Sequence, residues 1–159
     1  MATMDQLYQS VIIEHDRSPR NFRKLEAPTH HAEGHNPLCG DEVEVEFVVD
    51  ADGKIVDAAF QGRGCAVSKA SSSMMTMAVQ GKTIEEAREL ATLFQALLKK
   101  EPTDQAKLGK LKVFAGLGEY PMRVKCATMV WHAMNAALGG VRSETGDRRP
   151  ESAPPISDR

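Results

Sequence analysis

A chain of 159 residues with 42% hydrophobic and 26% charged residues has the size and composition of one globular domain, which excludes fibrous repeats and largely disordered proteins. The formal net charge of -2 provides no broad basic surface, so general nucleic-acid binding is disfavoured. Neither a signal-peptide pattern nor a continuous apolar stretch of membrane-spanning length is visible, and we therefore expect a cytoplasmic protein with no membrane or nucleic-acid partner.

The first part of the chain is predicted to form a helix followed by a loop. Thr3 and Gln6 have the spacing of a capping box, and apolar residues then recur at helical spacing over positions 7–12. We expect this helix to end near Pro19, because proline and its neighbours disrupt helical geometry. The stretch through positions 36–41 contains proline and glycine and is predicted to be a loop. The polar cluster His30, His31 and His35 lies just before these positions and is expected to belong to the same loop.

A β-hairpin is predicted next. Between Glu42 and Val49, glutamates alternate with valines and Phe47, a pattern typical of a half-buried strand with an acidic outer face. Gly53 follows an aspartate and marks the turn. The partner strand is predicted over residues 54–61, where apolar residues alternate at Val56, Ala58 and Phe60.

The second half of the chain is predicted to be mostly helical. Apolar residues have helical spacing over residues 68–79, a second capping box opens another helix at Thr83, and Pro121 opens the last one. Residues 108–117 fit no single pattern. This order of elements predicts an α+β fold, in which a small antiparallel sheet carries helices packed on one face.

We expect residues 1–140 to form the single domain. The tail of residues 141–159 contains several prolines, alternating charges and almost no apolar side chain. Such a segment cannot bury enough surface to offset the entropy of ordering it, and it is therefore predicted to be disordered.

Three cysteines are the main candidates for chemistry. They form no closely spaced pair, so their spacing alone is a weak metal signal. Their positions are more informative: Cys39 is in a proline- and glycine-containing turn, Cys65 lies between a Gly-x-Gly and a helix, and Cys126 is expected in the first turn of the last helix. Free N–H groups at a helix start lower the pKa of a nearby thiol. A single free cysteine is most often a buried apolar group, but three at such positions favour metal binding or nucleophilic chemistry in a reducing compartment.

Nearby polar residues provide further candidate ligands. Asp41 follows Cys39 by two residues and is either a turn residue or the fourth ligand of a zinc site that contains three thiolates. A rival site would use His31 and His35, but histidines in a loop are more often solvated than bound to metal. His35 could instead donate a proton near Cys39. The segment Gly62-x-Gly64 lacks the rest of a phosphate-binding loop, and its expected use is backbone freedom beside Cys65.

Four separated motifs, spread in order over residues 4–138, resemble the SufU branch of the IscU-like (NifU N-terminal) family. These motifs are Leu7-Tyr8-x-x-Val11-Ile12-x-x-His15 with Pro19-Arg20-Asn21, Asn36-Pro37-x-Cys39-Gly40-Asp41, Gly62-x-Gly64-Cys65-x-x-Ser68-x-Ala70-Ser71-x-Ser73, and Arg123-x-Lys125-Cys126.

The resemblance implies a protein of iron–sulfur cluster assembly that works with a SufS-type, pyridoxal-phosphate-dependent cysteine desulfurase. It implies zinc as the cofactor, held by Cys39, Asp41, Cys65 and Cys126. By the same resemblance, Cys39 is the catalytic sulfur acceptor, and Arg123 supports the site or docks the partner. We assign Lys125 the same supporting or docking role as Arg123.

Two features separate this chain from IscU scaffolds. An IscU scaffold usually has a histidine immediately before its third cysteine, where this sequence has Lys125. The segment between Cys65 and Cys126 is also longer than in IscU. Both features favour a zinc-dependent sulfurtransferase that accepts persulfide sulfur and passes it to downstream assembly proteins. Two alternatives stay open: a scaffold on which a [2Fe–2S] cluster forms at the same residues, and a structural zinc domain without transfer chemistry.

Overall fold

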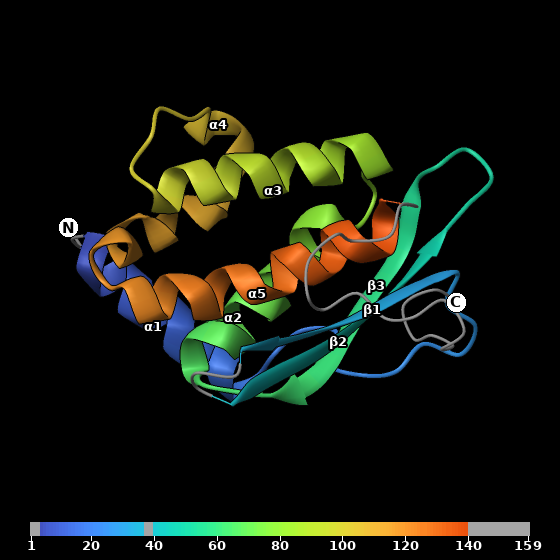
Figure 1. Ribbon diagram of the computed structural model, residues 1–159, viewed down its shortest axis with the longest axis horizontal. Helices are drawn as coiled ribbons and strands as arrows, with labels where there is room; N and C mark the ends of the chain where they lie inside the picture. The colour runs from blue at the N-terminus through green and yellow to red at the C-terminus, as the bar shows by residue number, and fades with distance from the viewer. Residues whose placement is uncertain (1–3, 37–39, 140–159) are drawn as a thin grey trace.

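A computed structural model describes residues 4–36 and 40–139, in which helices gather on one side of a three-stranded antiparallel sheet (Figure 1). The strands lie in the order β1-β2-β3. The α+β fold predicted from the order of the elements is confirmed. In chain order the elements are α1 (Met4–Arg17), β1 (His30–Asn36), β2 (Asp41–Val49), β3 (Ile55–Arg63), α2 (Ala66–Val79), α3 (Ile84–Leu98), α4 (Gln105–Leu108), the 3₁₀ helix η1 (Gly109–Glu119) and α5 (Pro121–Leu138).

The core lies between the sheet and α5, the helix that contacts β1 and β2 most extensively. A Cβ atom at Gly34 would lie only 3.3 Å from the Met129 side chain, so a small residue on β1 allows this close approach. Trp131 of α5 is fully buried and stacks on Phe94 of α3, with ring centroids 5.1 Å apart. Phe114 of η1 meets Phe94 edge to face, so one aromatic cluster joins three helices.

Helices α2 and α5 are joined by buried hydrogen bonds as well as apolar packing. The Ser71 hydroxyl donates to the Ala127 carbonyl at 2.6 Å, and the Trp131 indole N–H donates to Ser71 Oγ at 3.2 Å. A buried polar group without a hydrogen-bond partner would destabilise the fold, so these hydrogen bonds fix the position of α2 relative to α5. That setting matters for function because a cysteine lies near the start of each helix.

The prediction of a loop around the histidines is wrong, because residues 30–36 form strand β1. This segment lacks the β-branched and aromatic residues by which strands are normally recognised. Its small residues Ala32 and Gly34 face α5, while the alternate residues His31, Glu33 and His35 point to the opposite face. Pairing with β2, in the register His30↔Phe47 to Asn36↔Asp41, therefore makes the strand despite weak local propensity.

Two further segments depart from simple periodicity. The pairing of β2 with β3 shifts between Val48 and Val49, which leaves Val56 as an unpaired bulge residue that is 51% exposed, although it belongs to the alternating apolar set. The ambiguous segment of residues 108–117 is mostly 3₁₀ helix. Its buried residues recur every third position, which matches the three-residue turn of that helix: Leu108, Leu111, Phe114 and Leu117.

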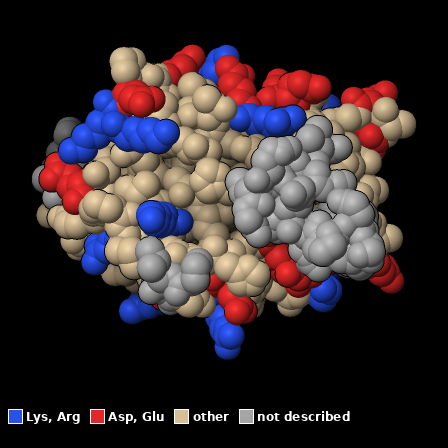
Figure 2. Space-filling model, viewed as in Figure 1, with Lys and Arg blue, Asp and Glu red and all other residues tan. Residues whose placement is uncertain are grey.

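The remaining predicted elements agree with the structure where it describes them. Helix α3 begins with the predicted capping box, in which Thr83 and Glu86 each bond the other's backbone N–H. The first capping box at Thr3 and the tail of residues 141–159 lie outside the described residues, and the domain assignment stays a prediction. Within the described ranges, every helix is too short or too polar to span a membrane. On the face seen in Figure 2, basic and acidic residues are interspersed among uncharged ones.

A buried histidine of α1 forms a hydrogen bond with a serine of α2. His15 Nδ1 lies 2.7 Å from Ser73 Oγ, and the same oxygen accepts the backbone N–H of Arg20 at 2.8 Å. The serine hydroxyl can therefore donate to a neutral His15 ring. Burial, assisted by the charge of Arg20, lowers the pKa of His15 below its ordinary value.

This pKa shift predicts a specific loss of stability in acid. Between the ordinary histidine pKa of about 6.5 and the lower folded value, the unfolded chain binds a proton that the folded chain does not, so the free energy of unfolding falls as pH falls. Urea unfolding at pH 7.5 and pH 5.5 should show a smaller pH dependence for His15→Gln than for the parent. Equal pH dependence in both proteins would contradict a neutral buried His15.

Candidate metal centre

Three side chains of types that can bind a metal converge in the structure from distant parts of the sequence. Asp41 stands at the start of β2, Cys65 caps α2, and Cys126 lies near the start of α5. One ligand atom from each of the three lies within 4.8 Å of the other two. Asp41 and Cys126 are buried, whereas Cys65 is exposed. The group therefore has one accessible side.

Asp41 and Cys65 are held together by direct contacts. The Cys65 backbone N–H donates to Asp41 Oδ1 at 3.2 Å, and Cys65 Sγ lies 3.7 Å from Asp41 Oδ2. Cys65 also acts as the N-cap of α2, because its Sγ accepts the Ser68 backbone N–H at 3.4 Å. The predicted position of Cys65 before a helix is thus confirmed, and a carboxylate tethers the start of that helix to the start of β2.

Two glycines before Cys65 make this contact sterically feasible. A Cβ atom at Gly64 would lie 2.9 Å from both Cγ and Oδ1 of Asp41. Gly62 has a φ of +145°, and a Cβ atom there would lie 2.2 Å from the Glu42 carbonyl oxygen. The expected backbone freedom beside Cys65 therefore has two parts: Gly62 lets β3 approach β2 closely, and Gly64 leaves space for the carboxylate.

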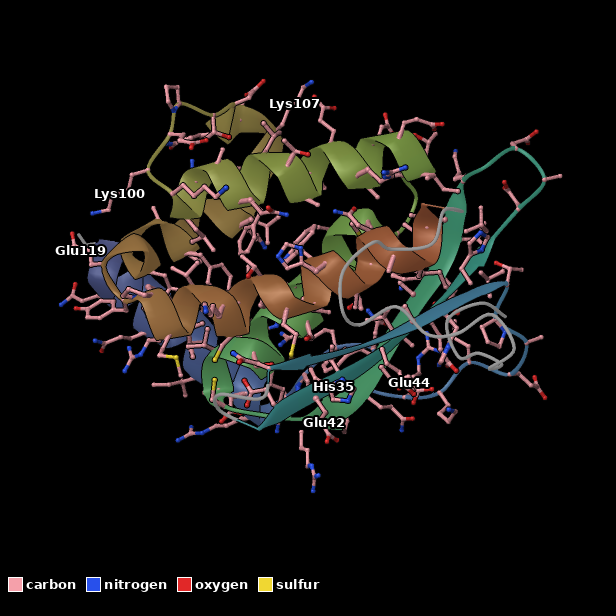
Figure 3. The ribbon with its side chains drawn as sticks, in the orientation of Figure 1. His35, Glu42, Glu44, Lys100, Lys107 and Glu119 are labelled. Carbon is pink, nitrogen blue, oxygen red and sulfur yellow. The ribbon has the colours of Figure 1, made fainter. Side chains whose placement is uncertain are left out.

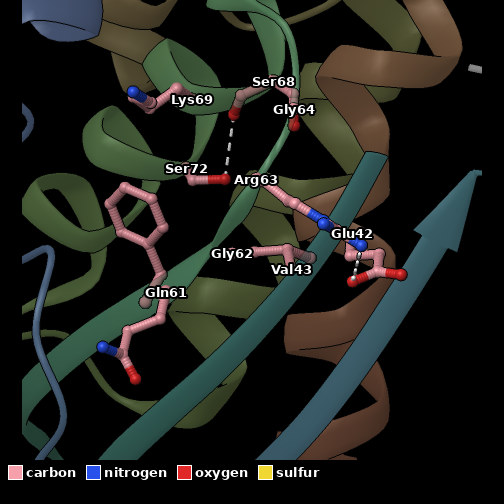
Figure 4. A pocket seen from close by; sticks show the side chains of 10 residues that line it. Glu42, Val43, Gln61, Gly62, Arg63, Gly64, Ser68, Lys69 and Ser72 are labelled. Atoms are coloured by element: carbon pink, nitrogen blue, oxygen red, sulfur yellow. Dashed lines mark hydrogen bonds and ion pairs between the residues drawn. The ribbon is translucent and has the colours of Figure 1, made fainter. Parts of the chain in front are cut away.

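A small cavity lies behind these glycines, between β2, β3 and α2 (Figure 4). Its volume of about 10 Å³ is close to the space needed by one water molecule. Ser68 and Ser72 of α2 line it, and the Ser72 hydroxyl donates to the Ser68 carbonyl at 2.9 Å. A cavity of this size holds no substrate, so any chemistry of the site takes place on the exposed side.

Cys126 lies deeper in its helix than the sequence predicted. Helix α5 begins at Pro121, a residue favoured at the first helical position, which places Cys126 in the second turn and not in the first. The argument from free N–H groups at a helix start therefore does not apply to this thiol. Its position instead follows from the packing of α5 on α2, next to the hydrogen bond between Ser71 and Ala127.

Cys39, the predicted sulfur acceptor, lies outside the described residues. Its neighbours fix where the connecting segment begins and ends: Asn36 and Asp41 are paired across β1 and β2, and the Gly40 N–H donates to the Asn36 carbonyl at 2.8 Å. Gly40 has a φ of +76°, a conformation that favours glycine. The roles assigned to Cys39, as ligand and as acceptor, stay predictions.

A cation and two tyrosines lie beside this group. The Arg123 guanidinium is 5.4 Å from the centre of the Tyr120 ring, and both residues are exposed, as is Lys125. Burial raises the pKa of the Tyr8 phenol, while the charge of Arg123 acts in the opposite direction and that of Cys65 adds to the rise. Tyr8 therefore lies within electrostatic reach of both. Sequence reasoning assigned no role to either tyrosine, although Tyr8 belongs to the first motif.

The rival histidine site takes another form in the structure. Among the described residues, His31 groups with Glu33 and Glu44, and not with His35. His31 is buried on β1, contrary to the expectation of a solvated loop residue. His35 is exposed on the same strand, and Figure 3 shows it near Glu42 and Glu44.

Comparison with known proteins places the whole arrangement in one family. The model of the NifU-like N terminal domain matches residues 7–127. The zinc-dependent sulfurtransferase SufU of Bacillus subtilis is 38% identical over 146 residues, which cover 91% of this chain and 96% of that protein. The iron-sulfur cluster assembly scaffold protein IscU of Streptococcus pyogenes is 38% identical over 139 residues, covering 87% of this chain and 86% of that protein.

Solved structures agree with the sequence comparisons. The crystal structure of FiSufU from Fervidobacterium islandicum AW-1 aligns with a TM-score of 0.79 and 36% sequence identity, and the alignment covers 83% of this chain and 96% of that one. The chain therefore belongs to the NifU-like N-terminal domain family, which includes the SufU and IscU proteins of iron–sulfur cluster assembly.

Proposed function

We propose that this protein is a zinc-dependent sulfurtransferase, which takes persulfide sulfur from a SufS-type cysteine desulfurase and passes it to cluster-assembly proteins in the cytoplasm. The observation that carries the proposal is the convergence of Asp41, Cys65 and Cys126 within 4.8 Å, at the end of the hairpin whose connection contains Cys39. The name of the Bacillus subtilis relative supports the same function.

The residues of the site fit a zinc ion. Two thiols and one carboxylate within 4.8 Å form a donor set that zinc accepts, and Cys39 would supply the fourth ligand. When bound, zinc would keep the cysteine sulfurs deprotonated. The backbone N–H of Cys65 orients the Asp41 carboxylate, so this ligand is held in place by the protein itself.

The proposed transfer is a thiol–disulfide-type exchange. The Cys39 thiolate attacks the terminal sulfur of the persulfide on the desulfurase. A new S–S bond forms on Cys39 while the S–S bond of the partner breaks, and the partner's cysteine leaves as a thiolate. Cys39 then carries the persulfide, and no oxidant or reductant is consumed. We assign the acceptor role to Cys39 because the resemblance to the SufU branch implies it, whereas Cys65 caps α2 and Cys126 is fixed within α5.

Arg123 and Lys125 are proposed to support docking of the desulfurase. Both are exposed on the same part of α5 as Cys126, so a partner that reaches the sulfur ligands would meet these cations. The contact of Arg123 with Tyr120 would hold the guanidinium beside the site.

Scaffolding of a [2Fe–2S] cluster is the second candidate function. The 38% identity to the Streptococcus pyogenes scaffold IscU favours it. Lys125 argues against it, because scaffolds of this family usually have a histidine there. Elemental analysis of protein purified without added metal separates the two functions: one tightly held zinc per chain supports transfer, whereas iron with sulfide supports scaffolding.

Gly64→Ala should weaken zinc binding. The added Cβ would approach Asp41 Cγ to 2.9 Å and displace the carboxylate, so we expect about tenfold weaker zinc affinity, measured by competition with a chromophoric chelator. Gly53→Ala is the control, because it adds a methyl group in open space at a positive φ of 82° and should cost stability without weakening zinc binding. Equal zinc affinity in both variants would contradict an Asp41 ligand whose position depends on Gly64.

Cys39 should gain one sulfur atom when the protein is incubated with a SufS-type desulfurase and cysteine. Mass spectrometry of peptides under non-reducing conditions locates the added sulfur, and Cys39→Ser should abolish stimulation of the desulfurase. Cys65→Ser is the matched control: it should lower zinc retention, while the added sulfur is still found on Cys39. Added sulfur on Cys65 or Cys126 of the parent, or normal stimulation by Cys39→Ser, would contradict the assignment.

A further inference from the structure

A second group of metal-binding side chains lies on the face of the sheet turned away from α5. His31 and Glu33 are two residues apart on β1 and therefore point to the same face, and Glu44 of β2 is paired directly with Glu33. His31 Nε2 lies 2.5 Å from Glu44 Oε2. One ligand atom of each of the three residues lies within 4.8 Å of the other two.

The positions of these side chains are set by the sheet. All three stand on paired strands, where the ladder fixes the direction of each side chain. The His31 side chain is only 10% exposed and that of Glu44 is 29% exposed, whereas Glu33 is open to solvent. The group is therefore ordered on one side and accessible on the other, as an ion-binding site requires.

The local charge favours a cation. Like charges directly opposite each other on paired strands are destabilising, and Glu33 faces Glu44 in this way. Lys24 partly balances the cluster, with Nζ 3.4 Å from Glu44 Oε2 and 3.5 Å from Glu46 Oε2. The Lys24 side chain is 57% exposed, so a divalent ion can displace its ammonium group into water at little cost.

We propose that His31, Glu33 and Glu44 form a second binding site, separate from the cysteine-containing centre, for a divalent transition-metal ion such as Zn²⁺. One imidazole nitrogen and two carboxylates are ligands that zinc accepts, with the remaining position left to water. Because the ligands come from both β1 and β2, a bound ion clamps the hairpin. The far end of the same hairpin, at the pair Asn36↔Asp41, leads into the first centre.

Cobalt binding distinguishes the two sites. Cobalt(II) takes the same ligands as zinc, and thiolate ligands give it an intense near-ultraviolet absorption that nitrogen and oxygen ligands do not. We expect untagged, chelator-stripped protein to bind two cobalt ions per chain, only one of which produces that band. His31→Gln and Glu33→Gln should each weaken the band-free ion about tenfold or more and leave the other unchanged.

Glu42→Gln is the matched control for this experiment. It removes a carboxylate from the same face of β2, where Glu42 is exposed and paired with Arg63, and should leave both cobalt ions bound. Glu33 is exposed, so Glu33→Gln keeps the fold even if His31→Gln does not. A single cobalt ion per chain, or a second ion unaffected by both variants, would overturn the proposal. Loss of the thiolate band alone would instead count against the first centre.

Discussion

The site depends on one contact, in which the backbone N–H of Cys65 donates to the buried carboxylate of Asp41. A buried carboxylate without such a partner would cost about 1–3 kcal/mol or more, so the bond fixes where β2 begins relative to α2. The same contact explains why Gly64 cannot carry a side chain without displacing Asp41. It also explains the position of the Cys65 sulfur, which caps the helix through Ser68 and remains exposed.

The other sulfur of the described site is positioned by packing. Cys126 reaches the group because α5 is fixed on α2 by Ser71, and because Trp131 anchors α5 in the aromatic core. Three separate sets of contacts thus bring together Asp41 at the start of β2, Cys65 at the cap of α2 and Cys126 inside α5. The candidate ligands therefore do not need to be close in sequence, and their wide spacing carries little signal by itself.

The local sequence was enough to predict those helices and strands that carry strong local signals. The glycines before Cys65 indicated a strand-to-helix change, and the capping box at Thr83 placed α3. It was not enough for β1, whose strand form depends on pairing with β2 and on small residues under α5. The burial of His31 could not be predicted for the same reason. The depth of Cys126 could have been read from the predicted helix start at Pro121, because the sixth residue of a helix lies in its second turn.

The most direct test of the central claim, a metal centre built from Asp41 and three cysteines, is X-ray absorption at the zinc edge of protein loaded with one equivalent of zinc. The account predicts three sulfur ligands at about 2.3 Å and one oxygen ligand at about 2.0–2.2 Å. In Asp41→Ala we expect zinc to be held less tightly, because the carboxylate ligand is lost. A shell of nitrogen and oxygen ligands in the parent, or zinc retention unchanged by Asp41→Ala, would contradict the account.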